Sequence, residues 1–398
     1  MKTLFLCGIV EDSCLQECLA KTKSFEFSAN LFQKKMIEGF KEYGDNFSVL
    51  SAPFIGSYPN ASFLKKFRGF QNVKESYQYV SFNNIWGIRN FSRARALKKA
   101  IRSFISLNDE EKLIVVYSPH TPFLEAAVYA KRKDPRIKIC LVVPDLPQYM
   151  NLNAKVSLLY RIAKKIDIRR FNKLNRMVDS YMLLTEPMKE VLHVGNRPYF
   201  VAEGIVTDDE LAEAEEKRAQ YPKDPSVRTV VYTGKLCERF GVKQLVDEFV
   251  QSPDPTWRLV LCGSGELAGY IKEVGRRDAR ICYQGQVPPE IAKAWMYRAD
   301  VLVNPRPNNG EYTKYSFPSK TIEYLLTGNP IVAYLLDGMP TVYGDLLYIP
   351  LDGINAAIAA ALKRSVRCCE TAPQRLVALR AENICEQIVR MANGESKS

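Results

Sequence analysis

Short apolar runs alternate with stretches of helical period along most of this chain. In the first half, the apolar runs with the length of buried strands are Thr3–Ile9, Phe47–Ser51, Leu113–Tyr117, Ile137–Val143, Ser180–Leu184 and Tyr199–Ala202. The stretches with a helical pattern lie between them, at Ala29–Tyr43, Phe91–Leu107, Phe123–Arg132 and Lys155–Asn175. This alternation predicts βαβ units and a parallel sheet.

The same alternation starts again in the second half. Its predicted strands are Thr229–Tyr232, Arg258–Leu261, Ile281–Tyr283, Val301–Val303 and Ile331–Tyr334. Between the halves, Ile205–Arg228 is rich in Asp, Glu, Lys and Pro, which predicts a charged helix and a linker. With 398 residues, the chain exceeds what one core usually holds. We predict two α/β domains, residues 1–205 and 206–373, with ligands at the carboxyl ends of their strands.

Composition indicates in which compartment of the cell we expect the protein. No run approaches the ~20 apolar residues that cross a bilayer, and the opening residues read as a buried strand rather than a leader. The ten cysteines are scattered, and several stand in apolar runs, which favours reduced thiols in the cytoplasm over a disulfide framework. Two cysteine pairs are close in sequence, but neither of the two histidines lies near them. We therefore expect no metal site.

The net charge of +12 predicts an anionic partner: nucleic acid, an acidic membrane surface or a phosphorylated small molecule. The segment Ala154–Arg176 has eight Lys and Arg residues against one acid. Leu159, Ile162 and Ile166 form an apolar stripe along it. Two interpretations stay open: a solvated helix that docks through this stripe, or a helix that attaches to anionic lipid headgroups.

The loop YTGKLCERFG, Tyr232–Gly241, follows the first strand of the second domain. Gly234 allows a tight turn and close backbone approach to a ligand. Lys235 and Arg239 place cations near the start of the next helix, where anions are favoured. The loop therefore predicts a diphosphate site, and a solvated turn with incidental charges is the alternative.

A second loop, CGSGEL at Cys262–Leu267, has Gly263 and Gly265 between a strand and a helix. This spacing allows the backbone to approach a phosphate. Small residues also occur wherever a strand turns sharply into a helix, so a purely architectural role is the alternative.

The third segment, YSFPSKTIEYLLTGNP at Tyr315–Pro330, predicts a helix that ends at Gly328. Ser316 or Ser319 would cap it. The residues at its entrance and first turn that would meet an anion are Ser316, Pro318, Ser319, Lys320 and Thr321. Glu323, in the next turn, can accept two hydrogen bonds from a ribose diol. A merely exposed helix acid is the alternative.

The segments YSFPSKTIEYLLTGNPIVA and YTGKLCERFGVKQLVDEF together resemble the donor domain of the family 4 glycosyltransferases of bacterial polysaccharide assembly. The resemblance implies a GT-B fold, in which two Rossmann-like α/β domains face a central cleft and a C-terminal helix, about 374–392, returns to the first domain. It implies a hexosyltransferase-type enzyme that moves a sugar with retention from a nucleotide-sugar donor, expected to be a UDP- or GDP-sugar. The implied acceptor is a glycan or lipid-linked oligosaccharide of capsule, exopolysaccharide or O-antigen type.

The family holds the donor diphosphate with a base after the first glycine and a second base nearby. Lys235 matches the first position. The usual second lysine is Phe240 here, so Arg239 is the expected substitute.

The family also has two glutamates eight residues apart. Glu323 matches the second, to which the resemblance assigns the ribose hydroxyls. Tyr315 stands at the first position, and Glu311, four residues upstream, is the other candidate for contact with the donor sugar.

In the first domain, VYSPHTPFLEA and VVPDLPQYM stand at predicted strand ends and are similar to acceptor-side loops of such enzymes. His120 and Asp145 are their candidate catalytic groups. The alternatives are that His120 caps the helix near Pro122 and that Asp145 caps a turn before Pro147. Phe25–Asn30 is a weaker candidate for the same site.

Glycosyl transfer requires stabilisation of the negative charge that builds on the leaving diphosphate. Lys235, Arg239 and Lys320 can supply it without a metal, and the sequence has no Asp-x-Asp motif of the metal-dependent GT-A class. The predicted catalytic set is His120, Asp145, Lys235 and Tyr315. The basic first domain predicts a peripheral enzyme on the inner face of the plasma membrane.

Two other classes of protein compete with this prediction. A nucleotide-sugar epimerase on the same fold usually relies on additional acids and histidines in the cleft. This sequence has only two histidines in total, which are few for that chemistry. A nucleic-acid-binding protein is suggested by charge alone, because RNA-binding aromatic motifs and zinc-finger spacings are lacking from the sequence. We expect no nucleic-acid partner.

Overall fold

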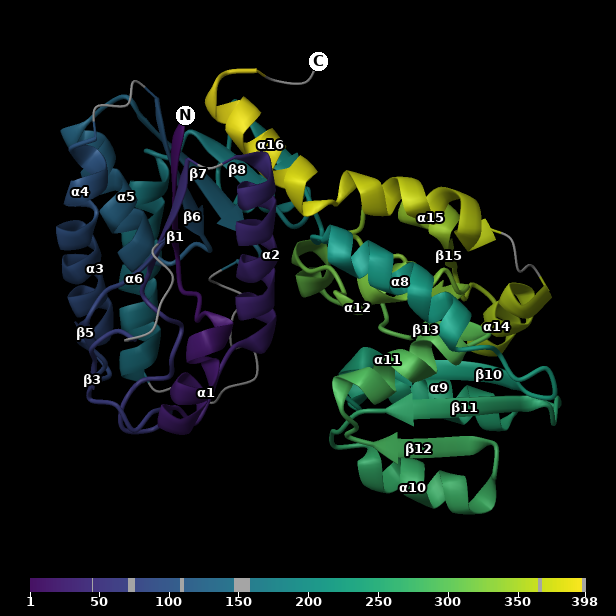
Figure 1. The fold of residues 1–398 in the computed structure, drawn as a ribbon. Coiled ribbons are helices and arrows are strands. Elements are labelled where there is room, and N and C mark those ends of the chain that lie inside the picture. The colour runs from purple at the N-terminus through teal and green to yellow at the C-terminus, as the bar shows by residue number, and fades with distance from the viewer. Residues whose placement is uncertain (45, 71–75, 108–110, 147–157, 364–366, 396–398) are drawn as a thin grey trace. The chain divides into compact units, whose positions relative to one another are not determined.

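The computed structural model describes residues 1–44, 46–70, 76–107, 111–146, 158–363 and 367–395 (Figure 1). The chain divides into two compact units. Unit 1 contains residues 1–205 and 381–398, and unit 2 contains residues 206–380. None of the described helices combines the length and the apolar character needed to cross a bilayer.

Unit 1 is built on a parallel sheet of seven strands in the order β4-β2-β1-β6-β7-β8-β9. The strands are β1 (Lys2–Cys7), β2 (Phe47–Ser51), β4 (Tyr77–Tyr79), β6 (Lys112–Tyr117), β7 (Ile137–Val143), β8 (Ser180–Leu183) and β9 (Tyr199–Val201). Phe5 of β1 lies opposite Val49 of β2 and Val115 of β6, and all three are buried. Helices cover both faces of such a sheet, which is why its central strands read as continuous apolar runs.

The helices of unit 1 surround this sheet. They are α1 (Asp12–Lys21), α2 (Phe27–Tyr43), α3 (Arg89–Ala100), α4 (Arg102–Ile105), α5 (Thr121–Lys133), α6 (Leu158–Asn175), α7 (Met188–Val191) and α16 (Ala381–Ala392). A short antiparallel pair, β3 (Lys66–Phe67) and β5 (Phe82–Asn83), lies in the connection between β2 and α3. The helix predicted over Phe91–Leu107 is in fact two helices, α3 and α4, with Ile101 between them.

The C-terminal helix predicted over about 374–392 is also two helices. The first, α15 (Arg367–Ala378), belongs to unit 2, and only α16 belongs to unit 1, where it packs on α2 (Figure 1). The helix breaks because Arg380 pairs with Val206 as a β-bridge and its guanidinium binds Asp208. Gly39 of α2 allows the close approach of α16, since a Cβ there would lie 2.3 Å from the Ala381 carbonyl oxygen.

Unit 2 has a second parallel sheet, in the order β12-β11-β10-β13-β14-β15. Its strands are β10 (Arg228–Thr233), β11 (Trp257–Cys262), β12 (Ile281–Gly285), β13 (Val301–Asn304), β14 (Ile331–Ala333) and β15 (Leu347–Tyr348). Its other elements are α8 (Asp208–Gln220), the 3-10 turns η1 (Glu238–Phe240) and η2 (Glu311–Tyr315), α9 (Val242–Val250), α10 (Ala268–Arg277), α11 (Pro289–Arg298), α12 (Lys320–Thr327), α13 (Tyr343–Leu346) and α14 (Ile354–Lys363). Central strands and the inner faces of α9 and α14 form one apolar core.

Candidate active site

The loops that follow β10 and β11 continue the hydrogen bonding of the sheet beyond the strands themselves. Gly234 N donates to Cys262 O at 2.9 Å, Leu236 N donates to Ser264 O at 2.9 Å, and Gly263 N donates to Gly285 O at 2.7 Å. These bonds hold both glycine loops rigidly at the carboxyl edge of unit 2, where open parallel sheets bind ligands.

Two tyrosines, one in β10 and one in β12, hold the same loops through hydrogen bonds from their hydroxyl groups. The Tyr232 hydroxyl donates to the Lys235 carbonyl oxygen at 2.9 Å, and the Tyr283 hydroxyl donates to the Gly263 carbonyl oxygen at 3.1 Å. The backbone around Lys235 is therefore fixed although its side chain is exposed.

Close packing explains both glycines of the second loop. At Gly263, where φ is +144°, a Cβ would lie 1.8 Å from the Gly234 carbonyl oxygen. At Gly265 a Cβ would lie 2.2 Å from the Leu236 carbonyl oxygen. Any side chain at either position would push the two loops apart.

These loops surround a hollow of about 420 Å³. Five of the residues predicted to bind the donor line it: Gly234, Lys235, Gly263, Gly265 and Lys320. Two ammonium groups and the backbone of two glycine loops thus meet at one place, which is the arrangement that an anion requires.

The entrance of α12 differs from the prediction, because neither serine caps the helix. The Ser319 side chain makes no capping hydrogen bond, and Ser316 Oγ instead accepts from Arg306 and donates to the Tyr312 carbonyl oxygen. Pro318 O accepts from Thr321 N at 2.8 Å and so takes part in the first turn. Thr321 is buried, and its Oγ1 has no hydrogen-bond partner within the described residues.

Glu323 lies one turn into α12. Its Oε2 accepts a hydrogen bond of 2.5 Å from Lys320 Nζ, and the two side chains are 42% and 37% exposed. The pair therefore keeps a carboxylate beside the hollow and within reach of solvent.

Arg239 does not line the hollow of the glycine loops. Its guanidinium stacks on the ring of Tyr312 at 4.0 Å, and Arg306 lies 5.2 Å from the centre of the same ring. Burial lowers the pKa of Arg306, and the positive Arg239 nearby lowers it further. Arg306 was not predicted from the sequence, although its place three residues after the predicted strand Val301–Val303 was a signal.

Tyr315 and Glu311, the two candidates for the missing first glutamate, stand at opposite ends of η2. Glu311 is exposed and Tyr315 is half-buried. Neither lines the hollow described above.

In unit 1, His120 occupies the N-cap position of α5, but its side chain makes no capping hydrogen bond. The alternative that His120 caps this helix is therefore confirmed for its position, and the cap is made by the His120 carbonyl oxygen, which accepts from Phe123 N and Leu124 N. The ring packs edge-on against Phe54 at 5.6 Å and Phe123 at 4.9 Å. Burial lowers the pKa of His120 well below its usual value, and the positive Arg93 and Arg89 add to the effect, so the imidazole is neutral at neutral pH.

Asp145 follows β7, the neighbour of the strand that precedes His120. The residue as a whole is exposed, but desolvation of the carboxyl by the protein around it and the negative Glu26 raise the pKa of Asp145 to about 6. Glu26 stands in the segment Phe25–Asn30, which places part of that segment beside Asp145. Pro147, the residue of the alternative turn, lies outside the described residues.

Within the described part of the chain, no group of three or more His, Cys, Asp or Glu side chains is arranged to hold a metal ion. All eight cysteines whose side chains are described are free thiols.

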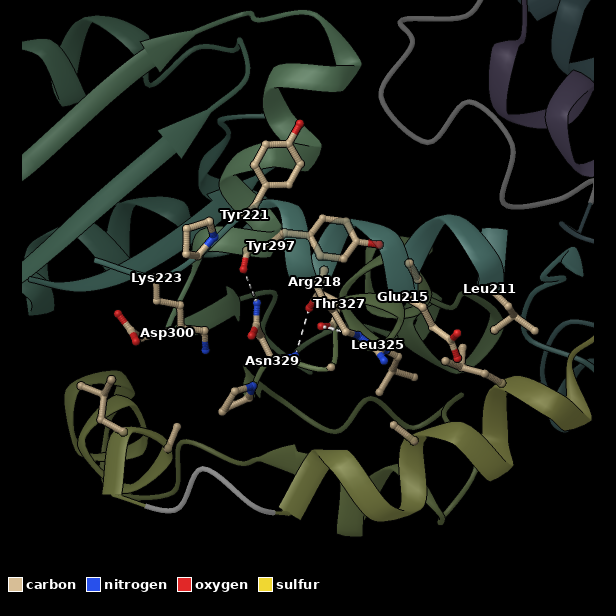
Figure 2. A pocket seen from close by; sticks show the side chains of 18 of the residues that line it. Leu211, Glu215, Arg218, Tyr221, Lys223, Tyr297, Asp300, Leu325, Thr327 and Asn329 are labelled. Carbon is tan, nitrogen blue, oxygen red and sulfur yellow. Dashed lines mark hydrogen bonds between the residues drawn. The ribbon is translucent and has the colours of Figure 1, made fainter. Parts of the chain in front are cut away.

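A larger cavity of unit 2, of about 670 Å³, has Arg218, Tyr297 and Asn329 among its lining residues (Figure 2). Arg228 and Asp300, which line it, stand at the amino ends of β10 and β13. Two of its polar side chains donate hydrogen bonds to the backbone of neighbouring helices: Asn329 to the Met296 carbonyl oxygen and Arg218 to the Leu326 carbonyl oxygen. We assign no chemistry to this cavity, because the carboxyl edge is the ligand-binding edge.

Solved structures define the class of protein: this is a GT-B glycosyltransferase fold. The lipopolysaccharide outer core galactosyltransferase WaaB is 12% identical, with a TM-score of 0.60 over 100% of both chains. Sucrose-phosphate synthase from Thermosynechococcus elongatus is 16% identical, with a TM-score of 0.60 over 99% of both chains. Anabaena HepE in complex with UDP is 15% identical, with a TM-score of 0.52 over 99% of this chain and 98% of that one.

The sequence identifies the family more closely. Residues 227–367 match the family described as Glycosyl transferases group 1, so unit 2 carries a domain of that family and the chain is a glycosyltransferase. No curated protein sequence matches the chain. The predicted fold class and the predicted class of enzyme are both confirmed.

Proposed function

We propose that this enzyme transfers a sugar, with retention, from a nucleotide-sugar donor to a glycan or lipid-linked oligosaccharide acceptor in polysaccharide biosynthesis. One observation carries the proposal: Lys235 and Lys320 meet the two glycine loops in one hollow at the carboxyl edge of unit 2. A nucleoside diphosphate is the ligand that such a group of cations and backbone NH groups favours. The UDP complex of the similar Anabaena HepE favours uridine as the base.

Donor binding and catalysis would share these residues. As the bond to the sugar breaks, negative charge builds on the diphosphate, and fixed ammonium groups stabilise it more in the transition state than in the ground state. Lys235 and Lys320 supply this stabilisation without a metal. Glu323, held by Lys320, accepts hydrogen bonds from the ribose hydroxyls.

Thermal unfolding with UDP, GDP, CDP, ADP and dTDP, each with and without Mg²⁺, tests the proposal. We expect one diphosphate to raise the Tm selectively, and a ligand at about 100 times its Kd stabilises by about 2.7 kcal/mol. The rise should persist without Mg²⁺ and disappear in Lys235→Ala and Glu323→Ala.

Two exposed ion pairs elsewhere in unit 2 provide matched controls. Lys243→Ala removes a lysine that pairs with Asp247, and Glu273→Ala removes a helix acid that pairs with Arg277. Both variants should keep the full nucleotide response. If the wild-type protein responds to none of the five diphosphates, the donor site is wrongly assigned.

On the acceptor side we assign His120 and Asp145, which follow adjacent strands of unit 1. The neutral imidazole of His120 can exchange hydrogen bonds with sugar hydroxyls. Asp145 can accept the proton of the attacking hydroxyl only when it is ionised.

The raised pKa of Asp145 predicts a pH dependence of transfer. We expect kcat/KM to fall as the pH drops through about 6, because the carboxylate becomes protonated there, and this limb should be absent from the residual activity of Asp145→Asn. A pKa raised by folding means that ionisation disfavours the folded state, so Asp145→Asn should raise the Tm at pH 8 but not at pH 4. A limb near pH 4 in the wild type would contradict the assignment.

The described part of α6 favours attachment to an anionic membrane. Ile162 and Ile166 are 49% and 58% exposed, so this part of the stripe does not dock onto unit 1. Arg161, Lys165 and Arg169 beside them are exposed as well. Apolar side chains flanked by cations are typical of helices that lie in a lipid headgroup layer.

Sedimentation with vesicles that contain 30% phosphatidylglycerol measures this attachment. We expect the wild type to bind at low salt and Ile162→Glu/Ile166→Glu to bind at least 10-fold more weakly. Leu351→Glu is the matched control, since Leu351 is 87% exposed in unit 2. Equal binding of all three proteins would exclude α6 as the contact.

A further inference from the structure

A groove of about 520 Å³ in unit 1 lies between the start of α3, the middle of α6 and the loop after β6. Arg89, Asn90 and His120 line its polar part. Trp86 and Ile166, which are 57% and 58% exposed, line its apolar part. The groove therefore combines polar groups beside the predicted acceptor residue His120 with an apolar border.

Two arginines of α3 place positive charge near this groove: Arg89 lines it, and Arg93 lies buried one turn further along the helix. Arg93 is only 2% exposed; its guanidinium donates to the Pro53 carbonyl oxygen and stacks on the Phe82 ring at 4.5 Å. One turn earlier, Arg89 Nη1 donates to the Ile55 carbonyl oxygen at 3.0 Å. Backbone carbonyls thus hold both guanidinium groups in fixed positions.

No acidic side chain in the described residues pairs with either arginine. Glu125 of α5, which is buried, forms ion pairs with Lys98 at 3.0 Å and with Arg170. Asp167 and Lys164, on α6, line the groove together, so α6 adds no net negative charge at this place. A buried cation without a counter-charge destabilises a fold, which suggests that Arg93 and Arg89 are kept for an anion that binds.

His120 Nε2, in the lining of the groove, is buried and has no hydrogen-bond partner within the described part of the chain, and the same holds for Arg93 Nε behind the lining. Buried polar atoms in folded proteins are nearly always hydrogen-bonded, so the free Nε2 of His120 indicates that a ligand of the groove can bind there.

We infer that the groove binds a phosphate group of the acceptor, with Arg89 and His120 as its contacts and Arg93 behind them as a fixed positive charge. The inference rests on the proposed function, since it names the chemistry of the acceptor. Guanidinium groups suit phosphate because their paired NH donors match two phosphate oxygens. Trp86 and Ile166 would lie along an apolar chain attached to that phosphate.

Tryptophan fluorescence of the full chain tests this inference, because Trp86 is one of only three tryptophans and lies in the groove. The probes are inorganic phosphate, glucose 6-phosphate and farnesyl phosphate in detergent, each titrated in the presence of UDP so that the donor site is occupied. We expect a saturable fluorescence change whose binding constant is at least 10-fold weaker in Arg89→Gln. In Trp86→Phe the fluorescence change should be absent. Arg95→Gln, an exposed arginine on the same helix, should bind as the wild type does.

The three probes separate the sources of the phosphate. Tighter binding of farnesyl phosphate supports a lipid phosphate, and equal or tighter binding of glucose 6-phosphate supports a soluble sugar phosphate. Binding that is unchanged in Arg89→Gln, or absent for all three probes, overturns the inference. A normal rise in Tm with UDP in Arg89→Gln shows that this variant is folded, and absence of that rise in the wild type would instead point to failure of the proposed donor site.

Discussion

Replacing Lys235 by alanine is expected to lower kcat by about 10²- to 10³-fold, which corresponds to about 3–4 kcal/mol of transition-state stabilisation. The backbone of this residue is fixed by the Tyr232 hydroxyl and by the bond between Leu236 and Ser264, so its side chain starts from a defined place in the lining of the hollow. Steady-state rates with the donor identified by thermal unfolding provide the measurement.

The comparison of kcat with KM separates two roles of Lys235. A higher KM with an unchanged kcat would mean that the ammonium group binds donor and transition state equally. Lys243→Ala, which removes an exposed lysine nearby in sequence, should leave both constants unchanged. A Lys235→Ala enzyme within 3-fold of the wild-type kcat would show that this group does not stabilise the leaving diphosphate.

Replacing Gly263 by alanine is expected to destabilise unit 2 by about 2–4 kcal/mol, in the range of severe single substitutions. The new Cβ would lie 1.8 Å from the Gly234 carbonyl oxygen, and a φ of +144° is unfavourable for any residue with a side chain. Because the loops must separate to accommodate it, the response to the nucleoside diphosphate should also be lost. Urea unfolding and thermal shifts with the nucleotide measure the two effects.

Gly269→Ala is the matched control for this substitution. Gly269 lies in α10, and nothing lies within 4 Å of a Cβ added there, so alanine should stabilise the helix by about 0.5–1 kcal/mol. If Gly263→Ala were as stable as Gly269→Ala and still bound the nucleotide, the packing of the glycine loops would not be what positions the donor.

The parts of the fold that could be read from sequence are those fixed by local apolar pattern. Ile137–Val143 was predicted with its observed bounds because a strand covered on both faces has a continuous apolar run. The short strands β3 and β5 and the helix α1 were missed. The two strands depend on each other, with Phe67 opposite Phe82, rather than on their own periodicity.

The candidate site could also be predicted from the sequence only in part. The glycines at 234, 263 and 265 were visible as motifs, and the structure explains Gly263 and Gly265 by close backbone packing and Gly234 by its positive φ of +154°. The serine cap of α12 was predicted wrongly because Ser316 is held by Arg306, ten residues away. The buried Arg93 could not be foreseen, since α3 reads as a polar helix and gives no sign of which arginine faces inward.

Helix α16 is the last part of unit 1 to be synthesised. Unit 1 contains the first residues of the chain, yet Ile384, Cys385 and Ile388 belong to its buried interior, and Cys385 Sγ donates to the Met36 carbonyl oxygen of α2. On the ribosome, residues 206–380 emerge before α16, which takes roughly 10–35 s at 5–20 residues per second. During that interval the face of α2 that α16 will cover is open to water and to chaperones. The unit made first is therefore finished last.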